Sequence, residues 1–392
     1  MKIINVIANA RQGGMPEHVL TLSRELKQRG HQVQVLSMTA GPMVQALERA
    51  GINTVTVPRL SHRMGKNPLL AVKVTRITRG LLQHMDPDII HTHGPRAHIL
   101  AGRASRYPGG HSLVATVHGS YRQFMAGNGG EFSRVTRRLK QLQYLGIDRY
   151  TAGIADRVIA VSDATRDDLV KGAGVPADKV CVIHNGVARQ QVSDEEIAAV
   201  RGGLGLGDAR KLVAYVGRMA FHKGAGDLVS AAAAVARQAP GARMVMVGEG
   251  PLSDELKEGV AAEGLRDRVM FTGHREDAVS IIAASDLFVL PSLSEGLALT
   301  LLEAAMTSTA MIATDVGGNP DVVRPGETGL LVPPRDPEAL AAAIVDLLRD
   351  DSRRAEMGAA ARRLWEREFT VGRMVDSIEA LYGELTADRR ND

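Results

Sequence analysis

The feature of this chain that most constrains its fold is a repeated alternation of short apolar runs with longer segments of helical periodicity. In the first half, apolar runs occupy residues 2–8, 33–36, 88–91, 113–117 and 157–161. In the second half they occupy residues 211–216, 243–248, 269–272, 286–290, 310–314 and 328–332. Short apolar strands separated by helices are typical of parallel sheets covered on both faces. The alternation therefore predicts an α/β protein with two doubly wound parallel sheets.

The length of the chain agrees with two domains, because 392 residues exceed what one hydrophobic core usually serves. Residues 184–192, which include the sequence His-Asn-Gly-Val, are interpreted as the hinge. We therefore predict an N-terminal domain over residues 1–187 and a C-terminal domain over residues 188–370. The final helices are expected over residues 336–350, 352–369 and 371–386.

The composition is that of an ordinary globular protein, with 44% hydrophobic and 23% charged residues. The single cysteine, Cys181, excludes an internal disulfide and suits a reducing compartment. The first residues enter a strand directly, so no signal peptide is expected. No apolar run approaches the roughly 18 residues of a membrane span. These features together predict a cytoplasmic protein.

The charge is distributed unevenly along the chain. Residues 1–190 hold 26 lysines and arginines against 12 aspartates and glutamates, whereas the remainder holds 22 against 32. A basic half beside an acidic half favours an anionic surface or acceptor as a partner of the first half. Nucleic acid fits poorly, because aromatic residues are only 3% of the chain and no stacking motif is present.

The clearest basic element is the segment 132–142. Its apolar residues fall on one helical stripe, which continues to Leu145, and its cations lie largely off that stripe. The stripe consists of Val135, Leu139, Leu142 and Leu145, and the cations are Arg134, Arg137, Arg138 and Lys140. Such a helix either lies on an anionic lipid surface or packs its stripe on the core. We favour core packing, since any surface helix shows this pattern, and its exposed cations could still touch a membrane.

The most specific pattern is the stretch 291–305, with the sequence PSLSEGLALTLLEAA. Glu295 lies in a loop after an apolar run, next to Gly296, which lets the backbone approach a ligand closely. Glu303 lies about one turn into the following helix. The free N–H groups at the start of that helix, a natural seat for phosphate, belong to Leu297, Ala298, Leu299 and Thr300.

A carboxylate beside a phosphate seat makes chemical sense when it accepts hydrogen bonds from hydroxyl groups. Sugar and ribose hydroxyls are the obvious donors, so the pattern predicts a site for a sugar nucleotide. The alternative is that Glu295 caps the helix and that Glu303 is an ordinary solvated helix residue.

A second cluster follows the strand-like run 212–216, in the sequence GRMAFHKG. Arg218 and Lys223 are five residues apart in this glycine-bounded loop, at the strand end where open α/β sheets bind ligands. Both cations could converge on one diphosphate, Arg with a planar fork and Lys as a point charge. The alternative is a pair of solvated loop cations.

These two patterns resemble the signature of the retaining glycosyltransferase family 4, also called group 1. The match consists of two glutamates eight residues apart, with Pro-Ser before and Glu-Ala-Ala after, and of the pattern G-R-x4-K-G. The resemblance covers nearly the whole chain and is most specific over residues 210–335. It implies the GT-B fold, in which two Rossmann-like domains face each other across a cleft and the last helix crosses back onto the N-terminal domain.

The resemblance also implies roles for glycines and for one histidine. The loop with Gly13 and Gly14 is expected to face the donor phosphates or the acceptor. His118, which follows the run 113–117, is expected to contact the donor sugar, with a core or capping histidine as the alternative. The strand-end loops expected to flank the nucleotide contain Gly248, Gly273, His274 and Arg275, the last two near the base.

A metal site is not expected. His91 and His93 have a spacing that could bind a metal, but no neighbouring ligand is evident in the sequence, and the family resemblance implies no metal or other cofactor. Two segments depart from the family pattern. Residues 307–310 replace a glycine-containing turn, and Asp321 stands where glutamate is common.

The expected activity is transfer of a sugar from a nucleoside diphosphate-sugar to an acceptor hydroxyl, with retention of configuration. UDP is the expected nucleotide and GDP the alternative. The expected acceptor is a lipid-linked or cell-surface glycan precursor, at the inner face of the membrane. The residues expected to act on the reacting groups are His118, Arg218, Lys223 and Glu295, and Glu303 is expected to hold the ribose. Alternatives are a sugar-nucleotide epimerase and a catalytically silent binding partner.

Overall fold

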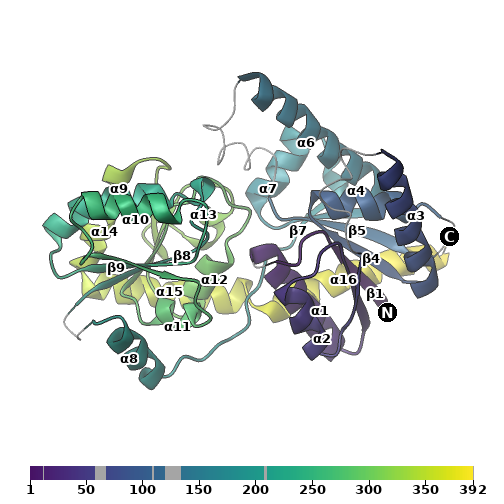
Figure 1. Ribbon diagram of the computed structural model, residues 1–392. Coiled ribbons are helices and arrows are strands. Elements are labelled where there is room, and N and C mark those ends of the chain that lie inside the picture. Colours follow the sequence, from purple (N-terminus) through teal and green to yellow (C-terminus); the bar gives the residue numbers. More distant parts are fainter. Residues whose placement is uncertain (12, 58–67, 108–109, 120–133, 207–209, 392) are drawn as a thin grey trace. The chain divides into compact units, whose positions relative to one another are not determined.

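The structure is a computed structural model that describes residues 1–391 except 12, 58–67, 108–109, 120–133 and 207–209. The described residues form two compact units (Figure 1). The N-terminal unit consists of residues up to 119, 134–188 and 371–391, and the C-terminal unit consists of residues 189–370, outside those gaps. The chain therefore leaves the first unit after Ala188 and returns to it at Val371.

The N-terminal unit contains a seven-stranded sheet with the order β3-β2-β1-β4-β5-β6-β7, in which all neighbours pair in parallel. Its strands are β1 Lys2–Ile7, β2 Gln32–Ser37, β3 Asn53–Thr56, β4 Ile89–His93, β5 Ser112–Val117, β6 Arg157–Ala160 and β7 Val180–Val182. The helices are α1 Gly14–Gln28, α2 Pro42–Arg49, α3 Pro68–Met85, α4 Pro95–Ala104, α6 Arg134–Ile154, α7 Asp163–Asp167 and α16 Val371–Asn391. A π-helical turn spans Asp168–Gly172 and a 3-10 turn spans Ala177–Lys179.

Alternate residues of each strand face opposite helical layers, as expected for a sheet buried on both sides. Ile3 and Ile7 of β1 pack in one cluster with residues of α1, α2 and α16. Ile4 and Val6 pack in the other cluster, with residues of α4 and the end of α6. The last helix of the chain therefore completes one of the two hydrophobic layers of the N-terminal unit.

The C-terminal unit contains a six-stranded parallel sheet with the order β10-β9-β8-β11-β12-β13. Its strands are β8 Leu212–Val216, β9 Arg243–Val247, β10 Val269–Gly273, β11 Leu287–Leu290, β12 Met311–Thr314 and β13 Gly329–Val332. Its helices are α8 Asp194–Gly203, α9 Ala225–Gln238, α10 Ser253–Ala262, α11 Ala278–Ala283, α12 Leu299–Met306, α13 Asn319–Val322, α14 Pro337–Leu348 and α15 Asp351–Glu368. A 3-10 turn spans Phe221–Lys223.

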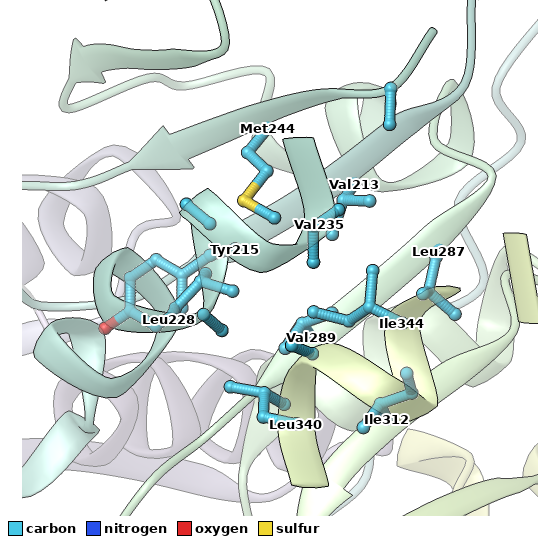
Figure 2. Close-up of a cluster of buried hydrophobic side chains, with 14 of the residues drawn as sticks. Val213, Tyr215, Leu228, Val235, Met244, Leu287, Val289, Ile312, Leu340 and Ile344 are labelled. Carbon is cyan, nitrogen blue, oxygen red and sulfur yellow. The ribbon is translucent and has the colours of Figure 1, made fainter. Parts of the chain in front are cut away.

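One face of this second sheet packs against α9, α10 and α14 in the largest described cluster of buried side chains. Figure 2 shows Val213, Val289 and Ile312 of three strands meeting Leu228 of α9 and Ile344 of α14. The sheet thus lies between two layers of helices, with α11, α12 and α15 on the opposite side from α9 and α10 (Figure 1). Both halves of the chain are doubly wound parallel α/β sheets, and the predicted fold class is confirmed.

The strands predicted from apolar runs are present within a few residues of the expected positions. Two edge strands, β3 and β7, were not predicted. β3 has the sequence NTVT and is half exposed, and β7 has only three residues, so neither produces a long apolar run.

The preferred interpretation of the basic helix is wrong for its first turns. Leu139 and Leu142 of α6 are 62% and 69% exposed, whereas Leu145 packs against the core. The first turns of α6 extend beyond α4, as Figure 1 shows, so the apolar stripe has no core to pack against there. The side chains of Arg134, Val135 and Arg137 lie outside the described residues.

Candidate functional site

The C-terminal sheet has its topological switch point between β8 and β11. The chain runs outward from β8 to β9 and β10, and then returns to place β11 on the other side of β8. Loops that follow two such strands diverge and leave a crevice at the carboxyl ends, where open α/β sheets bind their ligands. The two motifs predicted from the sequence are the loops that follow β8 and β11.

Glu295 is the buried centre of the loop that follows β11. Its side chain is 8% exposed, and its Oε1 accepts hydrogen bonds from Lys223 Nζ at 2.7 Å and from Ser292 Oγ at 2.6 Å. A buried carboxylate requires such partners, because an unpaired charge is costly to remove from water. The sequence predicted Glu295 and Lys223 as site residues, and the structure brings them into direct contact. It also adds Ser292, which is part of the motif but for which the sequence predicts no role.

Hydrogen bonds hold the loop after β11 against the loop after β8 and against the end of β12. Leu293 N donates to His222 O at 2.8 Å, and the Thr314 hydroxyl at the end of β12 donates to Ser292 O. Gly317, with φ of +53°, lies so close to the loop that a Cβ there would be 1.8 Å from Glu295 O. The loop is therefore confined by neighbouring backbone as well as by its own side chains.

Helix α12 begins immediately beside this carboxylate. Gly296, Leu297 and Ala298 are buried, and Ala298 is the N-cap residue but provides no side-chain hydrogen bond. The N–H groups of the first turn, including those of Leu299 and Thr300, therefore lack a side-chain cap. Uncapped N–H groups at a helix start favour an anion.

Glu303 lies half-buried in the second turn of α12, as the spacing predicted. The turn that follows α12 departs from the family pattern in sequence but keeps a regular geometry. Ser308 has φ of +60°, and Thr309 N donates to Ala304 O at 2.9 Å. These are the features of a Schellman motif, in which glycine is the usual residue at the position of Ser308. Asp321 lies in the first turn of α13.

The two cations after β8 have different surroundings. Lys223 is half-buried against Glu295, whereas Arg218 is exposed. The backbone carbonyl of Arg218 accepts a hydrogen bond from the Tyr215 hydroxyl at 3.0 Å, which holds the loop on the core. Burial raises the pKa of Tyr215, and the nearby negative charge of Glu295 adds to this effect. Tyr215 therefore remains a neutral donor at any physiological pH.

The loops that follow β9 and β10 complete this edge of the sheet. Gly248 has φ of +125°, and a Cβ there would be 2.0 Å from Gly217 O, so the loops after β8 and β9 touch through backbone. Gly273 ends β10, and His274 and Arg275 follow it on the surface. Arg275 forms a two-point ion pair with Asp277, at 2.7 and 2.6 Å, which lowers the pKa of that carboxyl.

The remaining predicted residues belong to the N-terminal unit. Gly13 has φ of +145° and precedes α1, in which Gly14 is the first residue. His118 follows β5 and is half-buried, with its Nε2 3.3 Å from Nδ1 of His93. These residues lie at the carboxyl edge of their own sheet, whose switch point is between β1 and β4.

Comparison with known proteins identifies the chain. Residues 197–364 match the family model "Glycosyl transferases group 1", and residues 12–191 match "Glycosyltransferase Family 4". The chain is 33% identical over 371 residues to a 2-deoxystreptamine N-acetyl-D-glucosaminyltransferase of Streptomyces fradiae, which covers 89% of this chain and 86% of that protein. The chain is a group 1 glycosyltransferase of family 4.

Other relatives of this glycosyltransferase are also sugar transferases. It is 33% identical over 298 residues to an alpha-D-kanosaminyltransferase of Streptomyces kanamyceticus, which covers 73% of this chain and 75% of that protein. It is 29% identical to a UDP-Gal:alpha-D-GlcNAc-diphosphoundecaprenol alpha-1,3-galactosyltransferase of Escherichia coli, with coverage of 91% and 90%. Such names establish a transferase of the hexosyltransferase type.

Solved structures show that the glycosyltransferase has the GT-B fold. HepE of Anabaena in complex with UDP superimposes with a TM-score of 0.80 at 23% identity, covering 98% of this chain and 100% of that one. The sucrose-phosphate synthase of Thermosynechococcus elongatus gives 0.81 at 23% identity, with coverage of 99% and 100%. Among the described residues, no helix combines the length and apolar character needed to span a bilayer.

Proposed function

We propose that this glycosyltransferase moves a sugar from a nucleoside diphosphate-sugar to an acceptor hydroxyl with retention of configuration. The observation that carries the proposal is the contact of Lys223 and Ser292 with buried Glu295, beside the uncapped start of α12. UDP is the nucleotide we propose, because the E. coli relative is named for UDP-Gal and HepE was crystallised with UDP.

The chemistry of this arrangement matches the demands of the reaction. Breaking the bond between sugar and phosphate places negative charge on the departing diphosphate. The N–H groups at the start of α12 and the cations Lys223 and Arg218 would stabilise that charge without rearrangement. Both hydrogen bonds to Glu295 fall on Oε1, which leaves Oε2 to accept a bond from a sugar hydroxyl.

Retention without a covalent intermediate requires the acceptor to attack the face of the sugar that the diphosphate leaves. Glu295 is held by Lys223 and Ser292 and serves as a hydrogen-bond acceptor rather than as a covalent nucleophile. The acceptor would then attack from the face that the diphosphate leaves, and the diphosphate itself would take its proton. Glu303 would bind the ribose hydroxyls, and His118 would contact the sugar from the N-terminal unit. We propose that no metal or other cofactor is required for transfer.

The test is a screen of UDP-, GDP- and ADP-sugars, with and without simple glycoside and undecaprenyl-diphosphate-linked acceptors. We expect release of UDP that increases when an acceptor is added, and a product with the anomeric configuration of the donor. Incubation with the chelator EDTA should not lower the rate. An inverted product would overturn the retaining mechanism, and an epimerised donor formed without acceptor would overturn transfer altogether.

We further propose that the acceptor is lipid-linked and that the N-terminal unit meets it at an anionic membrane surface. Helices α3, α4 and α6 lie side by side. Apolar and basic side chains are exposed together on α3 and α6, a combination typical of helices that lie on anionic lipid. These side chains are Val72, Lys73, Arg76, Ile77, Arg138, Leu139 and Leu142.

Co-sedimentation with vesicles tests this surface. Binding to phosphatidylglycerol vesicles should exceed binding to phosphatidylcholine vesicles and should weaken as salt rises. Replacing Leu139 and Leu142 by serine should reduce vesicle binding several-fold without changing turnover of a soluble acceptor analogue. Binding that is indifferent to salt and to these substitutions would contradict the proposal.

A further inference from the structure

Three histidines meet at the switch point of the N-terminal sheet. His18 lies on α1, His93 ends β4 and His118 follows β5, and each offers one ring nitrogen within 4.8 Å of the other two. The ring centres of His18 lie 5.4 Å from His93 and 4.7 Å from His118. The cluster therefore joins three segments that are far apart in sequence.

His18 is one of the two buried members of this cluster, and its ring is poorly hydrogen-bonded. His18 is 5% exposed, and neither of its ring nitrogens makes a hydrogen bond of ordinary geometry with a described group. Burial lowers the pKa of His18 to about 4, while Asn185 opposes this effect slightly. Burying a poorly hydrogen-bonded imidazole is costly, and the cost is reduced when one of its nitrogens binds a metal.

His93 is oriented as metal-binding histidines usually are. Its Nε2 lies 3.4 Å from Oδ1 of Asn5, whose amide nitrogen donates to Ser23 Oγ at 2.9 Å. An imidazole that donates from Nε2 to this amide oxygen presents an unprotonated Nδ1 to the cluster. That Nδ1 lies 3.3 Å from His118 Nε2, and two nitrogens on one tetrahedral zinc ion are about 3.3 Å apart.

His91, two residues before His93, makes its hydrogen bonds outside the cluster. His91 Nδ1 lies 2.6 Å from the Tyr382 hydroxyl and its Nε2 lies 2.7 Å from Thr116 Oγ1. Both of its nitrogens therefore have partners inside the unit. The spacing of His91 and His93 suggested a metal pair in the sequence, but His91 is structural, and the possible ligands beside His93 come from α1 and from the end of β5.

We propose that His18, His93 and His118 form a binding site for a zinc-class divalent ion. Three neutral imidazoles suit such an ion, and water would occupy the fourth position of a tetrahedron. The site is distinct from the chemistry of transfer, for which we propose no metal. Because His118 is also the residue that we expect to contact the sugar, the bound ion should inhibit the enzyme; this consequence rests on the proposed function.

The experiment is a titration of the tag-free, full-length chain with Co²⁺, followed by visible absorption and by calorimetry. We expect one equivalent to bind with the absorption of a nitrogen-rich tetrahedral site, and Zn²⁺ to displace it. The test variant is His18→Phe, because a phenyl ring fills the same buried space and the ring nitrogens make no hydrogen bond of ordinary geometry with a described group. Its thermal unfolding should match that of the wild type, while Co²⁺ affinity should fall at least 100-fold.

The control is His84→Ala, since His84 is exposed on α3 and lies outside the cluster. It should bind Co²⁺ like the wild type. Equal Co²⁺ binding by wild type and by folded His18→Phe, or no binding by the wild type, would overturn the site. In assays with donor and acceptor, Zn²⁺ should slow the wild type at least tenfold more than His18→Phe. A protein that binds Co²⁺ but shows no transfer with any donor would refute the proposed function and keep the site.

Discussion

At the scale of single residues, the site depends on the buried carboxylate of Glu295, which requires a counter-charge. Glu295 is buried, its ion pair with Lys223 is 2.7 Å long, and the lysine side chain is 24% exposed. In such a pair, desolvation offsets much of the attraction, so its net effect on stability is small while the loss of one partner is expensive. Under the proposed function, the pair holds two charges in position for a ligand.

Replacing Lys223 by methionine should therefore affect both activity and stability. We expect kcat/KM to fall by about 10²- to 10³-fold, as for the loss of one preorganised charge stabiliser, and the melting temperature to fall because Glu295 loses its counter-charge. The double variant Lys223→Met/Glu295→Gln should recover the melting temperature but not the activity. Lys257→Met, on the exposed surface of α10, serves as the control and should change neither.

Ser292 offers a finer test of how the carboxylate is positioned. Ser292→Ala removes the 2.6 Å bond to Glu295 Oε1 without changing any charge. We expect kcat to fall by about 10- to 150-fold, in line with roughly 1.5–3 kcal/mol for a hydrogen bond to a charged group. Ser294→Ala, two residues away and half-exposed, should retain full activity in the same steady-state assay. Equal losses in both variants would show that the loop is merely sensitive to substitution.

At the scale of elements, the loops at the carboxyl edge of the C-terminal sheet are packed backbone against backbone. Gly317 approaches Glu295, and Gly248 approaches the loop after β8, at distances that leave no space for a Cβ. The Glu295 loop is therefore positioned by glycines that let neighbouring backbone approach it, as well as by the hydrogen bonds within it.

Gly317→Ala should accordingly displace the Glu295 loop. Two costs combine, one from φ of +53° and one from a Cβ placed 1.8 Å from Glu295 O. The control is Gly326→Ala, which has φ of +78° but no atom within 4 Å of the added Cβ. Gly326→Ala should lose about 1 kcal/mol of stability and keep its activity. Gly317→Ala should lose more stability and at least tenfold in kcat/KM, measured by urea unfolding and by steady-state kinetics.

Helix α6 should make the stability of the N-terminal unit depend on pH. Burial, together with the charge of Asp168, raises the pKa of Asp148 to about 7 from 3.8. Between these two pH values the folded unit keeps a proton that the unfolded chain releases. The contribution of Asp148 to stability should therefore be most favourable below about pH 4 and should become less favourable as the pH rises to about 7.

Asp148→Asn removes this dependence. The free energy of unfolding of Asp148→Asn should equal that of the wild type near pH 4. It should exceed the wild-type value by at most about 4 kcal/mol at pH 8. Urea unfolding of both proteins across this range measures the difference, and the exposed Asp178→Asn serves as the control. An advantage that does not change with pH would contradict the raised pKa.

The sequence predicted most elements and the principal loops, because each motif directly follows an apolar run and must therefore lie at a strand end. It could not predict that Lys223 pairs with Glu295 rather than standing beside Arg218. That contact spans 72 residues and depends on β11 lying next to β8, an order that alternation alone does not determine. The histidine cluster was missed for the same reason, since His18 is remote from His93 in sequence and meets it only in the folded sheet.

At the scale of the whole molecule, the chain passes from the N-terminal unit to the C-terminal unit after Ala188 and returns at Val371, so α16 belongs to the N-terminal unit. Val375, Ile378 and Tyr382 of this helix are buried in the cluster that also holds α1. The Tyr382 hydroxyl bonds to buried His91 at 2.6 Å. The N-terminal unit therefore lacks part of its core until the end of the chain is in place.

A chain that ends at Thr370 should consequently lose the N-terminal unit and keep the C-terminal one. Removal of α16 exposes the apolar layer of β1 and α1 and leaves His91 with an unpaired nitrogen. We expect hydrogen exchange to show loss of protection in β1 and β4 with protection retained in β8 and β11. Retained protection in β1 and β4 would show that α16 is dispensable for this core.

The position of α16 in the sequence affects the order in which the two units can fold during synthesis on the ribosome. The unit whose codons are read first is the unit finished last, because its closing helix is translated only after every residue of the other unit. During that interval the nascent N-terminal segment has an uncovered apolar layer, a natural target for chaperones. The described residues of the C-terminal unit all lie between 189 and 370, so this part of the unit can fold as soon as it emerges from the ribosome.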